Sequence, residues 1–223
     1  MHVRSYPAIL YFGTPVVIVS TKNPNGTDNL APISSIFWLG WRCIIGIGAS
    51  SQTAKNLLRE KEAVLNLPSA SEVKAVNFLA KTTGTNPVPQ SKVLKGYRFE
   101  EDKFEIAGLT RLPSETVKAL RVKECPVHME VVVKAVHNLA GDDRVQQGKI
   151  KTFELKINRV FLDKSILMDH DPNRIDPDKW KPLIMSFQEF YTVGKKIHQS
   201  TLAEISESLY HSNDRKPDQE EYQ

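Results

Sequence analysis

The sequence lacks the features that mark secreted or membrane-spanning chains. Its two cysteines, Cys43 and Cys125, lie far apart among 223 residues, so neither a disulfide framework nor a cysteine-based metal site can be recognised. We expect both to be buried thiols in a reducing compartment. The longest uncharged hydrophobic stretch, residues 43–49, is too short to span a bilayer, and the first seven residues contain no apolar signal-peptide core. We therefore expect a cytoplasmic protein that has no membrane contact.

Basic clusters and glycine-rich nucleotide motifs are missing as well. The 30 basic and 26 acidic residues are interspersed, so the net charge of +4 forms no basic stripe of the kind that binds nucleic acids. No GxGxxG or P-loop motif occurs, which weighs against Rossmann and P-loop folds. Neither metal-ligand spacing among the histidines nor a Ser–His–Asp arrangement is present. We considered His128, His137, His170 and His198 as metal ligands, and their spacing predicts no metal site. We name no catalytic side chain.

Segments typical of β-strands and short helices make up most of the chain. Runs of β-branched and aromatic residues favour strands, whereas hydroxyl residues before good helix formers favour a helix start. Apolar residues at helical spacing favour a second helix. These patterns predict strands over residues 16–21, 33–39, 42–48, 63–67, 127–136 and 152–161, and helices over residues 51–60 and 72–80.

The connecting segments are polar or irregular. Turn-forming Asn, Pro, Gly and Asp predict hairpin loops, and a long loop inside a compact domain often has a functional reason. We expect a turn at residues 13–15, hairpin loops at 22–29 and 138–147, a long irregular excursion at 81–97, a short capped helix or turn at 114–117, and a packed segment of mixed or helical character at 180–194.

The order of these segments shows no βαβ rhythm and no internal repeat. It therefore favours a mainly β barrel with attached helices over a doubly wound parallel sheet. We expect one domain over residues 1–200. Residues 201–223 form a C-terminal extension that we expect to be partly disordered, beginning at about His211, because it is polar and has no periodicity.

One candidate ligand-binding segment, residues 46–56, joins a predicted strand to a predicted helix. Its small residues let a ligand approach the backbone, and the amides at a helix start favour an anion such as phosphate. Alternatively, Ser51 or Thr53 is only a helix N-cap, and the glycines serve packing. The pattern alone leaves both interpretations open.

A second candidate, residues 29–35, places polar and small side chains at the entry of an apolar strand. Backbone amides there could meet the carbonyl oxygens of a heteroaromatic ring, or the segment is simply a strand start with a proline on its rim. The neighbouring Phe37, Trp38 and Trp41 could flank a flat ligand or pack in a core or interface.

The order and spacing of several segments resemble the flavin-reductase-like FMN-binding split β-barrel family, which includes flavoredoxins and NAD(P)H:flavin oxidoreductases. The similarity runs from about Tyr11 to Tyr191. It rests on residues 14–17, 20–21, 26–32, 34–35, 51–57, 64–68, 102–104, 107–110 and 124–126.

This resemblance implies a homodimeric split β-barrel that holds FMN near the subunit boundary. The segment 29–35 would lie along the flavin, the strand-to-helix segment would hold the phosphate, and the loop 81–84 could reach the site from the partner chain. The implied cofactor-binding residues are Asn29, Ala31, Pro32, Ile33, Ser34 and Ser35 beside the flavin, Ala49, Ser50, Ser51, Thr53 and Asn56 at the phosphate, and Asn66, Leu67 and Pro68 as neighbours.

Two functions follow from the resemblance. The first is a flavin reductase that moves electrons from NAD(P)H to bound FMN. The second is a non-catalytic FMN-holding carrier that exchanges electrons with a redox protein partner. Many reductases of the family carry an Asp–His pair and a Gly–Glu–Val-like strand, whereas residues 137–156 read differently here, which favours the carrier. A barrel that has lost flavin or binds heme or a deazaflavin is a third alternative.

Overall fold

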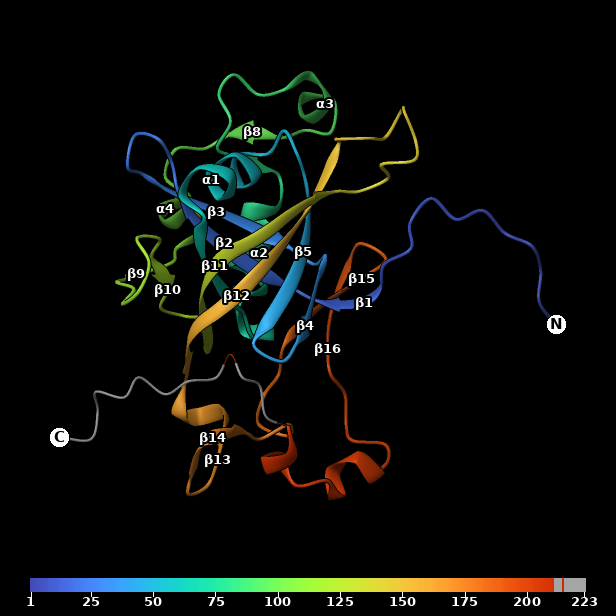
Figure 1. Ribbon diagram of the computed structural model, residues 1–223, viewed down its shortest axis with the longest axis vertical. Coiled ribbons are helices and arrows are strands. Elements are labelled where there is room, and N and C mark those ends of the chain that lie inside the picture. The colour runs from blue at the N-terminus through green and yellow to red at the C-terminus, as the bar shows by residue number, and fades with distance from the viewer. Residues whose placement is uncertain (211–213, 215–223) are drawn as a thin grey trace.

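The computed structural model describes residues 1–210 and residue 214. Its largest element is a curved sheet of seven strands, every neighbouring pair of which is antiparallel (Figure 1). In spatial order these strands are β3 (Asp28–Ile33), β2 (Val17–Lys22), β6 (Glu62–Leu67), β11 (Val127–Asn138), β12 (Ile150–Leu162), β5 (Arg42–Gly48) and β4 (Ile36–Leu39).

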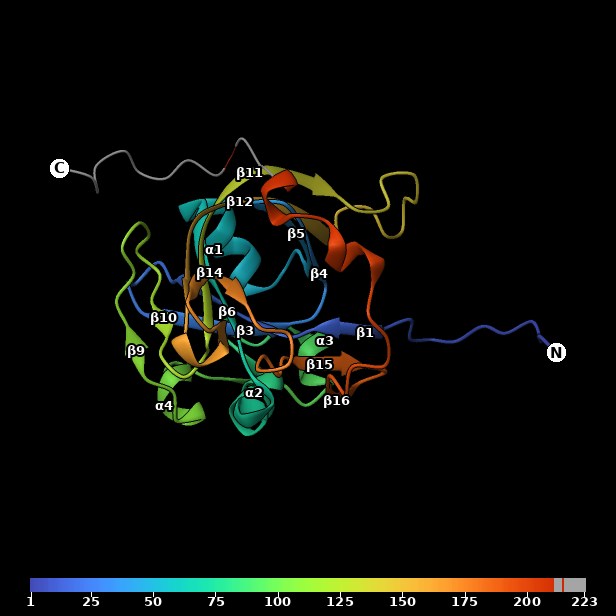
Figure 2. The same ribbon diagram turned by 90° about the horizontal axis from the view of Figure 1, so that it is seen from below.

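Helix α1 (Gln52–Glu60) lies within the curve of this sheet (Figure 2). Side chains alternate along each strand, so every second residue of β5, from Cys43 to Ile47, points inward. Ala54 and Leu57 of α1 are fully buried among these strand residues. The inner core therefore places the start of α1 beside β2 and β3, the strands it contacts.

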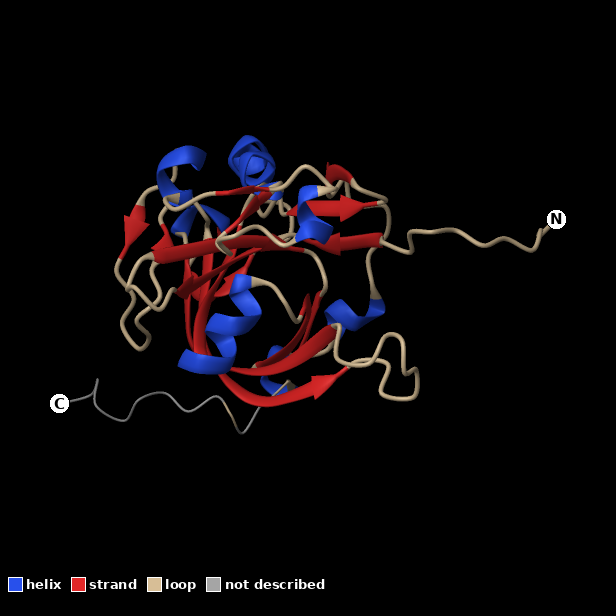
Figure 3. Cartoon of the chain, turned by 90° about the horizontal axis from the view of Figure 1, so that it is seen from above, coloured by secondary structure: helices blue, strands red, loops and turns tan. Residues whose placement is uncertain are grey.

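A second core covers the opposite face of β2 and β3. Helices α2 (Val73–Ala80) and α4 (Lys103–Ala107) pack there, outside the curve of the sheet (Figure 3). Ile18 and Leu30 of the sheet and Phe104 of α4 are fully buried in it. A small sheet of β1 (Phe12–Pro15), β15 (Leu183–Ser186) and β16 (Glu189–Thr192) extends this layer toward the N-terminus.

Short elements complete the described chain. Among the described residues, no helix is long and apolar enough to cross a membrane. The remaining elements are η1 (Ala70–Glu72), β7 (Thr82–Thr83), α3 (Gln90–Val93), β8 (Arg98–Phe99), β9 (Arg111–Leu112), β10 (Arg121–Val122), η2 (Lys164–Ile166), β13 (Leu167–Met168), β14 (Asp171–Ile175), η3 (Thr201–Glu204) and η4 (Glu207–Leu209).

The prediction of a mainly β barrel with attached helices is confirmed. The strand predicted over residues 42–48 has those bounds, and α1 begins after Ser51, whose hydroxyl accepts a hydrogen bond from the Ala54 amide. Cys43 and Cys125 are buried free thiols, as expected. The disorder predicted from about His211 falls on residues 211–213 and 215–223, which lie outside the described part of the chain.

Four local predictions were wrong. The segment 180–194 is a hairpin of β15 and β16, and residues 12–15 form strand β1 with a bulge instead of a turn. The segment 29–35 is not a strand entry, because residues 28–33 are themselves β3, and the predicted strand 33–39 is interrupted at Ser34 and Ser35. Pro32 is tolerated because β3 lies at the edge of the seven-stranded sheet.

Candidate functional site

A cleft of about 920 Å³ opens where the start of α1 meets β3, β5 and the segment after α2. Eight of the residues predicted to bind a cofactor line it: Asn29, Ala31, Pro32, Ile33, Ser34, Ser35, Ser51 and Thr53. The fold thus brings together the two segments that the sequence marked separately. Six of the predicted residues do not line it: Ala49, Ser50, Asn56, Asn66, Leu67 and Pro68.

Asn56 and Asn66 are held inside the protein. Both are fully buried. The Asn56 amide donates to Thr21 Oγ1 and Asn23 Oδ1, each at 3.0 Å. The Asn66 amide donates to the Ile18 carbonyl at 2.9 Å, and its oxygen accepts from the Val122 amide at 2.8 Å. These contacts assign both side chains to internal hydrogen bonding within the barrel.

The start of α1 presents hydrogen-bond donors to the cleft. Ser51, Gln52 and Thr53 line it, and the first amides of a helix have no acceptor within the helix itself. Ser51 caps the Ala54 amide at 3.1 Å, so the capping interpretation is confirmed for this residue. Capping does not remove the site, because the partial positive charge of a helix start favours an anion there.

Asn29 joins several segments at the floor of the cleft. It is 1% exposed, and its amide donates to Thr53 Oγ1 at 3.1 Å and to Thr21 Oγ1 at 3.3 Å. Its side-chain oxygen accepts from Lys103 Nζ at 3.1 Å. Asn29 therefore links β3 to β2, α1 and α4, and fixes the position of Thr53.

Four lysines line the cleft: Lys81, Lys92, Lys95 and Lys103. Among the residues that the structure describes, no aspartate or glutamate lines it. The lining is therefore cationic, and it complements an anionic group near the helix start. Lys92, Lys95 and Lys103 were not predicted as site residues. The one available signal was that Lys103 belongs to the 102–104 segment on which the family resemblance partly rests.

Lys103 has an unusual environment for an ammonium group. It is 3% exposed, and its Nζ donates to the Leu30 carbonyl at 2.8 Å in addition to Asn29. Burial, assisted by the charge of Lys92, lowers the pKa of Lys103 to about 7. Burial also lowers the pKa of Lys92, whose Nζ donates to Thr83 Oγ1 at 3.0 Å. Two partly desolvated amines thus face one cleft, where a bound anion would favour their charged forms.

The segment 81–84, which the resemblance implied could reach the site from a partner chain, lines the cleft of its own chain. Gly84 is the tightest point of this segment. A Cβ atom there would lie 2.7 Å from Asn29 Oδ1 and 3.1 Å from Gln52 Cγ. Only a residue without a side chain lets the loop approach both β3 and the start of α1.

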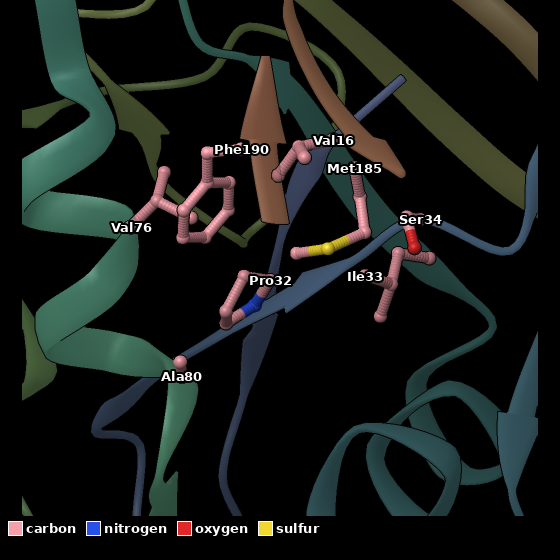
Figure 4. A pocket seen from close by; sticks show the side chains of 8 residues that line it. All are labelled: Val16, Pro32, Ile33, Ser34, Val76, Ala80, Met185 and Phe190. Atoms are coloured by element: carbon pink, nitrogen blue, oxygen red, sulfur yellow. The ribbon is translucent and has the colours of Figure 1, made fainter. Parts of the chain in front are cut away.

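The other end of the cleft is apolar. A side compartment of about 120 Å³ shares Pro32, Ile33, Ser34, Ala80 and Met185 with the main cleft. Figure 4 shows the Met185 side chain reaching across this compartment toward Pro32, with Phe190 and Val76 on the opposite side. Trp38 and Trp41 pack against the inner core instead, which leaves them outside the lining.

The cleft thus fits an elongated ligand with one anionic end and one flat, apolar end. The anionic end of such a ligand would meet the start of α1 and Lys103, which Asn29 links to Thr53, and the flat end would meet Ile33, Ala80 and Met185. A site of this volume falls in the usual range for small-molecule and cofactor sites, roughly 300–1,000 Å³. A flavin nucleotide has this combination of a phosphate and a planar ring system.

Comparison with known proteins identifies the family of the chain. The model of the family described as "Flavin reductase like domain" matches residues 9–175. The uncharacterized protein YdfE of Bacillus subtilis (strain 168) is 33% identical over 198 residues, which are 89% of this chain and 92% of that protein.

Two solved structures share the fold. Flavoredoxin of Desulfovibrio vulgaris (Miyazaki F) has a TM-score of 0.72 at 21% identity, covering 92% of this chain and 100% of its own. Nitrilotriacetate monooxygenase component B from Bacillus cereus has a TM-score of 0.68 at 20% identity, covering 86% and 89%. Because the family model spans most of the chain, the protein belongs to the flavin reductase like family and has a flavin-linked oxidoreductase or electron-transfer role.

Proposed function

We propose that the protein is a flavoprotein that binds FMN in this cleft and transfers electrons from NAD(P)H to the flavin. The observation that carries the proposal is the lining itself. In the part of the chain that the structure describes, four lysines and no carboxylate line the cleft. Lys103 is linked to Thr53 at the start of α1 through Asn29, and the side compartment is apolar.

The residues divide into two groups around the proposed ligand. Ser51, Gln52 and Thr53 hold the phosphate through hydroxyl and amide donors, and Lys103 neutralises its charge. Residues 31–35 support the ring and the ribityl chain. Of the fourteen residues that the resemblance implied, the eight that line the cleft are assigned to the ligand.

The chemistry of electron transfer belongs to the flavin, which when bound accepts and releases electrons at its ring. The protein contributes position and shielding. Met185 and Ile33 cover the apolar end from water, and Asn29 keeps Thr53 and Lys103 in a fixed relation through two hydrogen bonds. No side-chain acid or base is assigned to the reaction.

A second candidate function is an FMN-holding carrier that exchanges electrons with a protein partner. The observation that favours it is the segment 137–156, which departs from the reductase pattern and forms the end of β11, a long loop and the start of β12. Ile150 of this segment lines the cleft. The departure therefore lies beside the proposed flavin, where a nicotinamide would have to approach.

A spectral titration distinguishes the two functions. Adding FMN to the purified protein is expected to perturb the flavin absorbance between 300 and 550 nm and quench its fluorescence. Anaerobic addition of NADH, then NADPH, is expected to bleach the bound flavin within seconds to minutes. A flavin that binds but keeps its oxidised spectrum would favour the carrier, and absence of binding would reject both functions.

We also propose that the protein works as a homodimer joined near the β1–β15–β16 sheet. Phe12 and Phe187 stack edge to face there, 4.9 Å between centroids, while remaining 73% and 48% exposed. Tyr11 and Gln188, beside them in sequence, line the cleft.

Light scattering after size exclusion is expected to give twice the 25.2 kDa chain mass. A Phe12→Asp, Phe187→Asp double variant should give the chain mass, and a native chain of single mass would reject this proposal.

A further inference from the structure

The side compartment extends past the main cleft into the second core. Five of its lining residues are shared with the cleft, whereas Val16, Val76 and Phe190 line the compartment alone. Val16 and Val76 are buried members of the second core, and Phe190 packs against it. In Figure 4 Val76 and Phe190 lie on the side of the compartment opposite Met185 and Ser34. The compartment therefore has an apolar inner end and an opening toward the cleft.

The size of the compartment selects small rings. Its volume is about 120 Å³, and a cavity of roughly 150 Å³ with an aliphatic and aromatic lining binds benzene. The ring system of a flavin consists of three fused rings, so it is too large for this space and remains in the main cleft. A single six-membered ring fits, whereas two fused rings exceed the volume. The proposed flavin thus leaves room for a second, smaller molecule beside it.

The lining indicates an uncharged ligand with a hydrogen-bonding edge. Among the described residues, no charged side chain lines the compartment, which disfavours a carboxylate or a phosphate there. The hydroxyl of Ser34 lies at the opening, and within the described part of the chain it makes no hydrogen bond. A hydroxyl both donates and accepts hydrogen bonds. Ser34 can therefore bind a carbonyl oxygen as well as a phenolic hydroxyl.

We propose that the side compartment is an acceptor site for a single-ring quinone, which the bound flavin, once reduced, converts to a hydroquinone. The inference rests on the proposed function, because NAD(P)H must first reduce a flavin in the main cleft. Ser34 donates to the quinone carbonyl and accepts from the hydroxyl of the product. A nicotinamide ring has a similar size, but it becomes a cation on oxidation, and an apolar inner end disfavours a cation.

The reaction balances with the reduced flavin as the reductant. One N–H bond of the reduced flavin breaks, and its hydrogen leaves with the electron pair to form an O–H bond on the quinone. The second hydrogen of the reduced flavin leaves as a proton and reaches the other quinone oxygen through water. The quinone thereby gains two electrons and becomes the hydroquinone, while the flavin returns to its oxidised form.

The test measures how hydroquinone, the product of para-benzoquinone, binds to the oxidised, FMN-loaded protein by anaerobic calorimetry. Reduction of oxidised flavin by hydroquinone is unfavourable, so the readout is binding alone. The native protein is expected to bind hydroquinone roughly 5- to 100-fold more tightly than naphthohydroquinone, because a ligand with a second ring overpacks the compartment.

Two variants change the compartment in opposite directions. Val76→Phe is expected to fill the inner end and to weaken hydroquinone binding by roughly 10- to 100-fold, because the ring loses its apolar enclosure. Its FMN affinity should stay native, since Val76 does not line the main cleft. Phe190→Ala is expected to enlarge the compartment and to remove the preference for the smaller ring. Thermal melting checks the fold of each variant, and Phe190→Ala decides the test if Val76→Phe does not fold.

Phe78→Ala is the matched control, because Phe78 is an exposed phenylalanine of α2 that lines neither the cleft nor the compartment. It should keep the native preference. Equal native affinity for the two diols, or a preference that survives in Phe190→Ala, would overturn the acceptor site. Displacement of hydroquinone by NAD⁺ would assign the compartment to the nicotinamide ring and also overturn it. Absence of FMN binding would reject the proposed function itself, whereas FMN binding without hydroquinone binding would reject only the acceptor site.

Discussion

Replacing Lys103 with methionine is expected to weaken FMN binding by roughly 10- to 100-fold, the usual loss for one charge-assisted hydrogen bond. Methionine keeps an unbranched chain of similar length but removes the ammonium group. The native amine is 3% exposed and lines the phosphate end of the proposed site. Riboflavin, which has no phosphate, is expected to bind the variant and the native protein equally. Equal FMN affinity in the two proteins would place the phosphate elsewhere.

The effect of pH on FMN affinity is a sharper form of the same experiment. Because the pKa of Lys103 is about 7 in the free protein, the amine loses its charge as the pH rises above 7, and FMN affinity is expected to fall between pH 7 and 9. The Lys103→Met variant should lose this dependence.

A folded-state pKa of Lys103 below the ordinary 10.5 also means that the free protein gains stability as the pH rises from about 7 toward 10.5. Denaturant titrations at pH 7 and 9 measure that gain.

Gly84→Val is expected to lower the stability of the protein by about 1–3 kcal/mol and to abolish tight flavin binding, as overpacking of a close contact usually does. The added Cβ would lie 2.7 Å from Asn29 Oδ1. Asn29 cannot turn away freely, because Thr21, Thr53 and Lys103 all hydrogen-bond to it. The loop must move instead, which separates it from the start of α1. Thermal melting and an FMN titration measure the two effects.

The matched control for this prediction is Gly141→Ala. An added Cβ at Gly141 meets no atom within 4 Å, and the residue lies in the loop between β11 and β12. This variant should melt like the native protein and bind FMN with native affinity. A Gly84→Val variant that behaves like this control would show that the loop has room to move without loss of the site.

The sequence was most informative where local chemistry determines structure. Strand β5 follows from a short apolar run rich in isoleucine, and the capped start of α1 follows from Ser51. The β15–β16 hairpin was missed because its apolar residues also fit helical spacing. Its two-residue turn, Phe187–Gln188, has φ values of 47° and 70°, and such turns are normally recognised by Asn or Gly, which are absent here.

The residues of the candidate site also differ in how far they could be predicted from the sequence. The hydroxyl segment and the β3 segment were each visible in the sequence, because each is continuous and its residue types suggest a ligand. The family resemblance placed Asn56 at the phosphate. A helix turns about 100° per residue, however, and the Asn56 side chain faces Thr21 and Asn23. Lys92 and Lys103 are far from both segments in sequence, and only the packing of α4 and the 81–97 segment brings them in.

The hydrogen bonds of Asn29 have a consequence for how binding and folding are connected. They join residues 24 and 74 positions apart, so the phosphate end exists only after contacts between distant segments have formed. A partly unfolded chain would have no such site, and a ligand that binds only the native state raises the free energy of global unfolding. Bound flavin should therefore slow amide hydrogen exchange throughout the barrel, including strands β6 and β11, which do not line the cleft.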